Sequence, residues 1–455
     1  MRLFYSPFLH LANFRGWSTI YIMKTYYGAE TEKALKNFPF STHPARMEFI
    51  LAIVKIKKAA AVANFKAGNI SIEIQNAIVK ACDEILKGKL SDQFPLSSFQ
   101  GGAGTAIHMN VNEVIASRAN EVLKNKVHPN DHVNASQSTN DVNPSALKIA
   151  ALFLLGDLEI KLSSLVKTFQ KKSREFKNIN KLARTHMQDA VPTTLGEEFS
   201  SYSESLKRHL SQIKYAKDLC RVLNLGGTAI GNSINASPVY MREVYKELNK
   251  ITGGKFYKAQ NLMSKTSGQT DFLIISQTIN NMCLDLSKIA NDFKFMSSGP
   301  NGGIGEIILP EIQKGSSIMP GKVNPVLPET MNQLYYLVSG NNLCIEKAVE
   351  GAQMELGVMI PVMVDRLVES IKLSTEVINQ FDKLCVAGIK ADKEKCKLHL
   401  ENSTAYATLL TPRLGYDTVS MIVKKSIYTK KSLRDIVVGE KHLTEKEFEK
   451  IINSF

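Results

Sequence analysis

One apolar stripe restricts the fold of this chain more than any other feature of its sequence. The stripe consists of Phe272, Ile275, Ile279, Met282, Leu286, Ile289, Phe293 and Met296. Spacings that alternate between three and four residues, over more than three heptads, place these side chains along one side of a single long helix. Because one helix cannot bury such a stripe by itself, the chain needs other long helices to pack against it.

Two further stretches show the same periodicity. One runs through Leu147, Ala151, Leu154, Leu158, Leu162, Leu165 and Phe169. The other covers residues 351–381, where Pro361 is expected to kink the helix. Since few segments have the period of a β-strand, we predict a mostly α-helical protein with a long central helical bundle. Stripes this continuous also favour packing across subunits, and the alternative is a monomeric bundle.

Breaks in the helical pattern predict the domain boundaries. The segment NDVNP at residues 140–144 stands directly before the long helices, and residues 388–392 precede a lysine-rich tail. We predict an N-terminal, mainly helical domain (1–139), a central long-helix bundle (140–393) and a small C-terminal helical domain (394–455). In the tail, two short helices are expected, and a capping box of Thr444 and Glu447 begins the second. Residues 1–22, free of acidic side chains, are interpreted as an irregular extension.

Composition narrows the choice of partners. Lysine and arginine exceed aspartate and glutamate by 57 − 43 = 14 in this 455-residue chain. Such a balance suits nucleic acids, anionic membranes or acidic substrates. The basic residues are scattered, and their short runs lack interleaved aromatic residues, so we expect no nucleic-acid partner. No apolar run reaches about 18 residues, the length needed to span a membrane, and we therefore expect no membrane partner.

The cysteines and histidines argue against a metal centre. None of the six cysteines forms a CxxC pair, which is typical of free thiols in a reducing compartment and predicts a cytoplasmic protein. His128 and His132 are four residues apart, as in an HExxH zinc motif. However, Pro129 occupies the place of the glutamate and disfavours a helix interior. We expect neither a metal nor another cofactor.

Four polar clusters carry the chemistry. The first, GGAGTAIHMNVNEV, combines exposed backbone N–H groups with the Thr105 hydroxyl, which suits a carboxylate; alternatively, Thr105 caps a helix. In the second, Ser138, Thr139 and Asn140 precede a long helix, where they cap it or hold an anion at its positive end. In the third, RTHMQDAVPTTLG, Thr185 and His186 adjoin, and a structural role stays open.

The fourth cluster, GSSIMPGKVNP at residues 315–325, looks like a phosphate loop but fails its rules. That motif needs four residues between its first glycine and its Gly-Lys pair, and a serine or threonine directly after the lysine. Here five residues separate Gly315 from Gly321, and Val323 follows Lys322. The remaining Ser316, Ser317, Lys322 and Asn324 suit a small carboxylic acid or form a solvated turn.

Together, the clusters offer neutral donors, one lysine and one histidine, which favours a dianionic substrate held by hydrogen bonds. The simplest chemistry on such a substrate is removal of a proton next to a carboxylate. The developing oxyanion then needs preorganised donors, and a serine base needs a lowered pKa.

Taken in order, the four clusters resemble the characteristic regions of the aspartase/fumarase superfamily, and the similarity runs from about Tyr26 to the C-terminus. The resemblance implies a three-domain, L-aspartase-like fold. It also implies a homotetramer with a 20-helix core, in which three subunits contribute to each active site, and a dicarboxylate substrate.

The resemblance also implies roles for individual residues. Ser316 resembles the general base, and His186 is similar to a carboxylate-binding histidine that is oriented by Glu329. The residues that resemble binders of the reacting carboxylate are Thr105, Ser138 and Thr139, with Asn140 near the leaving amine. Those that resemble binders of the other carboxylate are Thr185, His186, Lys322 and Asn324.

The superfamily reaction is a reversible anti-elimination that yields fumarate. The segments GGAGT, LPEIQ, NPVLPETMNQ and GAQMELGVMIPV resemble the aspartase branch, which implies deamination of L-aspartate through an aci-carboxylate. The alternatives are a class II fumarate hydratase and a non-catalytic structural protein. The chain departs from the family pattern at Ala106, His108, Asn232, Ser233 and Asn301; His108 stands where relatives usually have asparagine.

Overall fold

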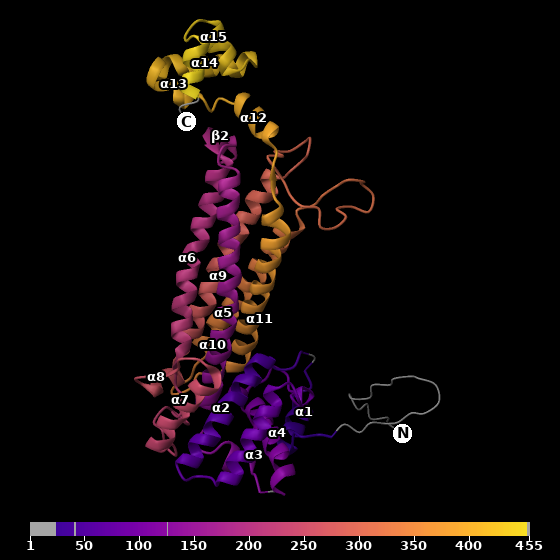
Figure 1. Cartoon of the computed structure of the whole chain (residues 1–455), viewed down its shortest axis with the longest axis vertical. Helices are drawn as coiled ribbons and strands as arrows, with labels where there is room; N and C mark the ends of the chain where they lie inside the picture. The colour runs from indigo at the N-terminus through magenta and orange to yellow at the C-terminus, as the bar shows by residue number, and fades with distance from the viewer. Residues whose placement is uncertain (1–23, 41, 125, 453–455) are drawn as a thin grey trace, which may run out of the picture.

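A bundle of five long helices forms the centre of the molecule. The structure is a computed structural model that describes residues 24–40, 42–124 and 126–452. The five helices are α5 (Thr139–Glu175), α6 (Leu195–Arg221), α9 (Thr270–Met296), α10 (Val326–Glu350) and α11 (Ile360–Gln380). They lie lengthwise beside one another, with α5 against α6 and α11 and α9 against α6 and α10 (Figure 1). The predicted mostly helical fold with a long central bundle is confirmed.

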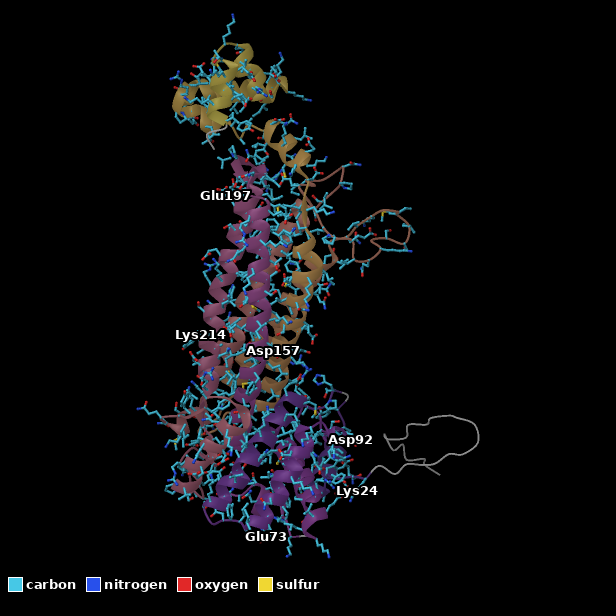
Figure 2. The ribbon with its side chains drawn as sticks, viewed as in Figure 1. Lys24, Glu73, Asp92, Asp157, Glu197 and Lys214 are labelled. Atoms are coloured by element: carbon cyan, nitrogen blue, oxygen red, sulfur yellow. The ribbon has the colours of Figure 1, made fainter. Side chains whose placement is uncertain are left out.

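Burial of the apolar stripes holds the bundle together. All eight stripe residues of α9 are buried, and so are those of α5 except the half-buried Leu154. An aromatic layer connects these helices, because the Phe293 ring lies 5.6 Å from Phe199 and 5.9 Å from Phe381, centroid to centroid. Charged side chains such as Asp157, Glu197 and Lys214 lie on the outer faces (Figure 2).

Two prolines act differently from the sequence-based prediction. Pro361 lies in the first turn of α11, where its missing N–H has no helical partner to lose, so it begins the helix and does not kink it. Pro144 lies inside α5, which already begins at Thr139 behind the N-cap Ser138. The predicted break at residues 140–144 is therefore the first part of the helix. Two of the five long helices, α6 and α10, were not predicted from the spacing of apolar residues.

Smaller elements cover both ends of the bundle (Figure 1). At one end lie α1 (Ala29–Asn37), α2 (Met47–Lys66), α3 (Ile72–Leu86), α4 (Thr105–Leu123), α7 (Pro238–Thr252) and α8 (Leu262–Ser267), with the short parallel pair β3 (Val222–Leu223) and β4 (Tyr257–Lys258). The other end carries the hairpin of β1 (Asn180–Thr185) and β2 (Gln188–Thr194), the pair β5 (Ile307–Ile308) and β6 (Lys390–Ala391), and α12 (Lys393–Glu401).

The C-terminal helices have an apolar core of their own. They are α13 (Ala407–Leu414), α14 (Tyr416–Thr429), α15 (Leu433–Gly439) and α16 (Glu445–Ile452). The two expected short helices are confirmed, and Thr444 and Glu447 form the predicted capping box. The three domain ranges stay a prediction, and the extension at residues 1–22 lies outside the described residues. Within the described part of the chain, no helix is long and apolar enough to cross a membrane.

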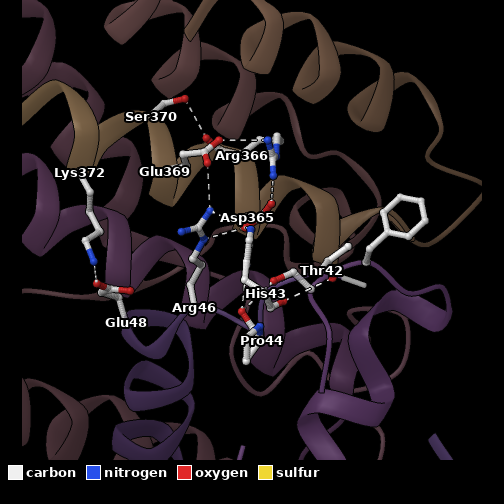
Figure 3. Close-up of polar contacts among 12 residues, drawn as sticks. Thr42, His43, Pro44, Arg46, Glu48, Asp365, Arg366, Glu369, Ser370 and Lys372 are labelled. Atoms are coloured by element: carbon white, nitrogen blue, oxygen red, sulfur yellow. Dashed lines mark hydrogen bonds and ion pairs between the residues drawn. The ribbon is translucent and has the colours of Figure 1, made fainter. Parts of the chain in front are cut away.

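A cluster of charges fastens the N-terminal helices to the bundle (Figure 3). Arg46, just before α2, lies 2.6 Å from Asp365 Oδ1 and 3.3 Å from Glu369 Oε1, both on α11. His43 Nε2 lies 3.3 Å from the same Asp365 oxygen, and Arg366 lies 3.0 Å from Glu369. Because Asp365 is nearly buried between its cations, this cluster fixes the start of α11 against the segment that leads into α2.

A lysine is buried within the N-terminal helices. Lys57 of α2 is fully buried, and its Nζ donates a hydrogen bond of 2.8 Å to Asn134 Oδ1. Burial lowers the pKa of Lys57 to about 7, although nearby Asp141 opposes the shift. Burial likewise raises the pKa of Asp141 to about 6, against three backbone N–H groups that favour its charged form. Both groups therefore titrate in the folded protein near neutral pH.

The α9 stripe gives a first prediction. Leu286→Ala, at a fully buried position, is expected to lower the free energy of unfolding by about 3–5 kcal/mol, because it removes apolar contacts and leaves a cavity. Urea unfolding followed by circular dichroism measures the change. Leu398→Ala, at a half-exposed position of α12, is the control and should change stability by less than about 0.5 kcal/mol. Equal losses in the two variants would contradict the role of the stripe.

Lys57 gives a second prediction. Since its pKa is depressed in the folded state, the unfolded chain binds a proton between about pH 10 and 7 that the folded chain does not, and stability falls as the pH falls. Lys57→Met removes this proton. The free energy of unfolding of the variant, relative to that of wild type, should rise by up to about 1.4 kcal/mol for each unit by which the pH is lowered. Urea unfolding at three pH values between 7.5 and 9.5 measures this difference. Parallel stability curves for the two proteins would contradict the depressed pKa.

Candidate active site

The starts of two helices meet at one end of the bundle. Thr105 is the first residue of α4, and Ser138 caps α5, with its Oγ accepting a hydrogen bond of 3.2 Å from Asn140 N. Asn143 Nδ2 donates to the carbonyl of Ala103 at 3.0 Å and thereby links α5 to the turn before α4. Helix N-termini present unpaired N–H groups and a positive dipole end to an anion. Thr105, Ser138, Thr139 and Asn140, predicted from separate clusters, therefore border one region.

The glycine turn before α4 is closely packed. Gly104 has a φ of +81°, a conformation that favours glycine, and a Cβ there would lie 2.8 Å from Asn143 Nδ2 and displace the amide that binds Ala103 O. Thr105 is not the cap of α4, because Gly104 occupies that position. The Thr105 hydroxyl instead donates back to the carbonyl of Gly102 at 2.8 Å. The turn thus holds Thr105 exposed at the helix start.

A loop after α6 wraps around the start of α5. Asp141 Oδ2 accepts hydrogen bonds from Gly226 N at 2.8 Å and Thr228 N at 3.2 Å, and Asn140 Nδ2 donates to Ala229 O at 2.8 Å. A cavity of about 510 Å³, lined in part by Ser138 and Thr228, lies beside these contacts. Sequence reasoning missed Asp141 and Asn143. Both could have been found from the sequence, because they are polar residues one and three positions after Asn140, where a buried helix usually has apolar residues.

Thr185 and His186 lie at the turn of the β1–β2 hairpin. Both are exposed, and His186 and Met187 have φ values of +53° and +61°, as a two-residue type I′ turn requires. The base of the hairpin is held by Glu306, which is fully buried. Its carboxylate lies 2.8 Å from Arg184 and 3.0 Å from Lys181. These ion pairs connect the hairpin to the chain that continues into the loop of Ser316.

The loop of Ser316 is closed on itself. Asn324 Nδ2 donates to Gly315 O at 2.7 Å, and a Cβ on Gly315 would lie 2.0 Å from Lys322 O, so only glycine fits there. The half-buried Ser316 Oγ accepts hydrogen bonds from Ile318 N at 3.2 Å and Met319 N at 3.0 Å. Two N–H donors at one oxygen favour its deprotonated form, the form that a serine base requires.

One chain does not bring all the predicted residues together. Because α5 has 37 residues, its ends are about 55 Å apart, and the hairpin lies beyond the end opposite Ser138 (Figure 1). The segment that carries Ser316 projects sideways from the bundle. Glu329 is exposed in the first turn of α10, and among the described residues no hydrogen bond or ion pair joins it to His186. The predicted site is thus divided into three groups.

His128 and His132, the pair considered for metal binding, accept hydrogen bonds from backbone N–H groups of their own turn. His128 Nδ1 accepts a hydrogen bond of 3.2 Å from Asp131 N, and His132 Nδ1 accepts one of 2.8 Å from His128 N. In the part of the chain that the structure describes, no three His, Cys, Asp or Glu side chains are grouped to hold a metal ion.

Comparison with known proteins identifies the family. A family model described as Lyase matches residues 23–340, and one described as Fumarase C C-terminus matches residues 407–454. An aspartate ammonia-lyase of Bacillus subtilis is 42% identical over 94% of this chain and 92% of the relative. One from Escherichia coli K12 is 39% identical over 94% and 91%.

Solved structures agree in fold. The crystal structure of a fumarate lyase:delta crystallin from Brucella melitensis has a TM-score of 0.91 at 40% identity, covering 95% of each chain. A class II fumarase from Schistosoma mansoni also has a TM-score of 0.91, at 34% identity over 94% of this chain and 95% of its own. The resemblance read from the four clusters is therefore confirmed, and the chain belongs to the aspartase/fumarase superfamily of lyases.

Proposed function

We propose that this chain is an enzyme that deaminates L-aspartate reversibly to fumarate and ammonia. The observation that carries the chemistry is Ser316 Oγ, which accepts two backbone N–H groups in a loop closed by Asn324. The choice of aspartate is supported by relatives named aspartate ammonia-lyase that match 94% of the chain. The runner-up is hydration of fumarate, supported by the class II fumarase among the structural neighbours.

In the proposed reaction, the Ser316 alkoxide removes a proton from Cβ of aspartate. The electron pair delocalises into the adjacent carboxylate and forms an aci-carboxylate. The N–H groups at the starts of α4 and α5, with Thr105, Ser138 and Thr139, stabilise its added charge, because such donors are already oriented before the charge develops. The electron pair of the aci-carboxylate then returns to form the Cα=Cβ double bond of fumarate. The Cα–N bond breaks beside Asn140, and the electron pair of that bond leaves with the protonated amine as ammonia.

The remaining predicted residues hold the second carboxylate. Lys322 supplies a positive charge, and Thr185, His186 and Asn324 supply hydrogen-bond donors. Glu329 orients the His186 ring. Every one of these side chains except the half-buried Asn324 is exposed in the single chain, which leaves them available to another subunit.

We infer a homotetramer with a 20-helix core, in which three subunits complete each site. The length of α5, about 55 Å, supports this arrangement, because Ser138 lies at its start and the hairpin that carries His186 lies beyond its other end. Exposed apolar side chains on the bundle support it as well, since Ile160, Tyr336 and Leu343 are each more than half exposed. The six free cysteines are consistent with the cytoplasmic location that we also propose.

The proposed base gives a third prediction. Ser316→Ala should lower kcat for fumarate release from aspartate at least about 100-fold, because it removes the oxygen that is proposed to take the Cβ proton. Absorbance of fumarate is measured with aspartate and malate offered in parallel. The matched control is Ser317→Ala, the exposed neighbour, which should retain most activity. Near-normal activity of Ser316→Ala would contradict the assignment, and a wild type that converts malate alone would favour the fumarase alternative.

Shared active sites give a fourth prediction. Ser316→Ala and Thr139→Val change different groups of the divided site. Alone, Ser316→Ala should be nearly inactive, and Thr139→Val should be much less active than wild type while keeping a measurable activity. Co-expressed, they should form hybrid tetramers in which some sites contain no substituted residue, so activity should exceed that of either parent. Two variants of the same group, Ser138→Ala and Thr139→Val, form the control. A co-expressed pair no more active than its parents would indicate sites contained within one chain.

A further inference from the structure

His108 of α4 is a buried histidine that touches the proposed site. Its side chain is 1% exposed, and its Nδ1 lies 2.9 Å from the Thr139 hydroxyl oxygen at the start of α5. Among the described residues, no other hydrogen-bond partner of that hydroxyl exists. The second ring nitrogen, Nε2, is buried as well and has no partner in the same part of the chain.

The surroundings keep this imidazole neutral. Burial lowers the pKa of His108 well below its usual value, and the nearby amine of Lys57 acts in the same direction. A neutral imidazole carries one proton, on Nδ1 or on Nε2, and the partner of each nitrogen decides which. The structure supplies a partner for Nδ1 alone.

The two tautomers differ in what they leave unpaired. A proton on Nε2 would be a buried N–H group without an acceptor, and such orphaned donors are rare in folded proteins. A proton on Nδ1 is donated to Thr139 Oγ1, and only a lone pair on Nε2 stays unused. The geometry therefore favours the Nδ1–H tautomer, in which the Thr139 oxygen is the acceptor.

We propose that His108 is a positioning residue: by donating from Nδ1 to Thr139 Oγ1, it directs the Thr139 hydroxyl proton toward the carboxylate of the substrate. The proposal deepens the proposed function and rests on it. With His108 as the donor, the hydroxyl proton has no acceptor among the described residues, which leaves it free to point into the site. With His108 as the acceptor, the Thr139 lone pairs would face the carboxylate and repel the charge that grows during the reaction.

The departure from the family pattern fits this role. An asparagine at this position has both amide donors and an acceptor, so it satisfies Thr139 in either direction. The neutral imidazole has one donor, and burial of Nε2 assigns that donor to Thr139. His108→Asn should therefore preserve the hydrogen bond, whereas His108→Leu should remove it.

Kinetics of four variants form the first part of the test and give a fifth prediction. His108→Leu should lower kcat/KM for aspartate on the order of 10-fold, while His108→Asn should stay near wild type. His108→Leu should have no further effect when Thr139 is already replaced by valine, because two residues that act through one contact are not additive. Circular dichroism verifies that each variant is folded. An unchanged or higher kcat/KM of His108→Leu would overturn the proposal, and so would an added loss in the double variant.

The tautomer itself is the second part of the test and needs no turnover. In protein labelled with ¹⁵N-histidine, the His108 resonances are identified by their loss in His108→Asn. We expect the Nδ1 shift of a protonated nitrogen and the Nε2 shift of a bare one. The reverse pattern, or a doubly protonated ring, would overturn the proposal. If the wild type converts neither aspartate nor malate, the proposed function fails, while this measurement still decides the direction of the hydrogen bond.

Discussion

Mutual burial of the long apolar stripes is the interaction on which the rest of the structure depends. The stripes of α5 and α9 lie inside the bundle, and the Phe199, Phe293 and Phe381 rings join neighbouring helices across it. Dense packing of this kind leaves little freedom for one helix to slide along another. The bundle is therefore a fixed frame, and the groups at its two ends have defined positions relative to each other.

The polar groups that border the proposed site are held by buried hydrogen bonds. Asp141 accepts hydrogen bonds from N–H groups of the loop after α6, and Asn143 donates a hydrogen bond to a carbonyl of the glycine turn before α4. Neither residue needs to touch a substrate to matter. Each one fixes a neighbour, and a buried polar group that lost its partner would be costly to the fold. Rigidity at the starts of α4 and α5 is what allows their N–H groups to act as preorganised donors.

Much of the fold could be predicted, because periodicity depends only on which side of a helix faces the core. The α9 stripe and the capping box at Thr444 followed from local patterns alone. Pro361 shows the limit, since the same residue kinks a helix interior and begins a helix end, and the pattern of residues 351–381 did not show where the helix starts. The four polar clusters could be predicted from their residue types. That His108 would meet Thr139 depends on how α4 packs on α5, which no local pattern encodes.

The length of α5 has a consequence for how this protein can change over time. Each residue of an α-helix adds 1.5 Å and a rotation of about 100°, so one inserted residue would turn every later side chain of α5 away from its neighbours. It would also displace the β1–β2 hairpin, with Thr185 and His186, from its place relative to Ser138. Insertions are tolerated best in exposed loops. We therefore expect a change of length within α5 to disrupt the fold, and changes of length to be tolerated in the connections between the central helices.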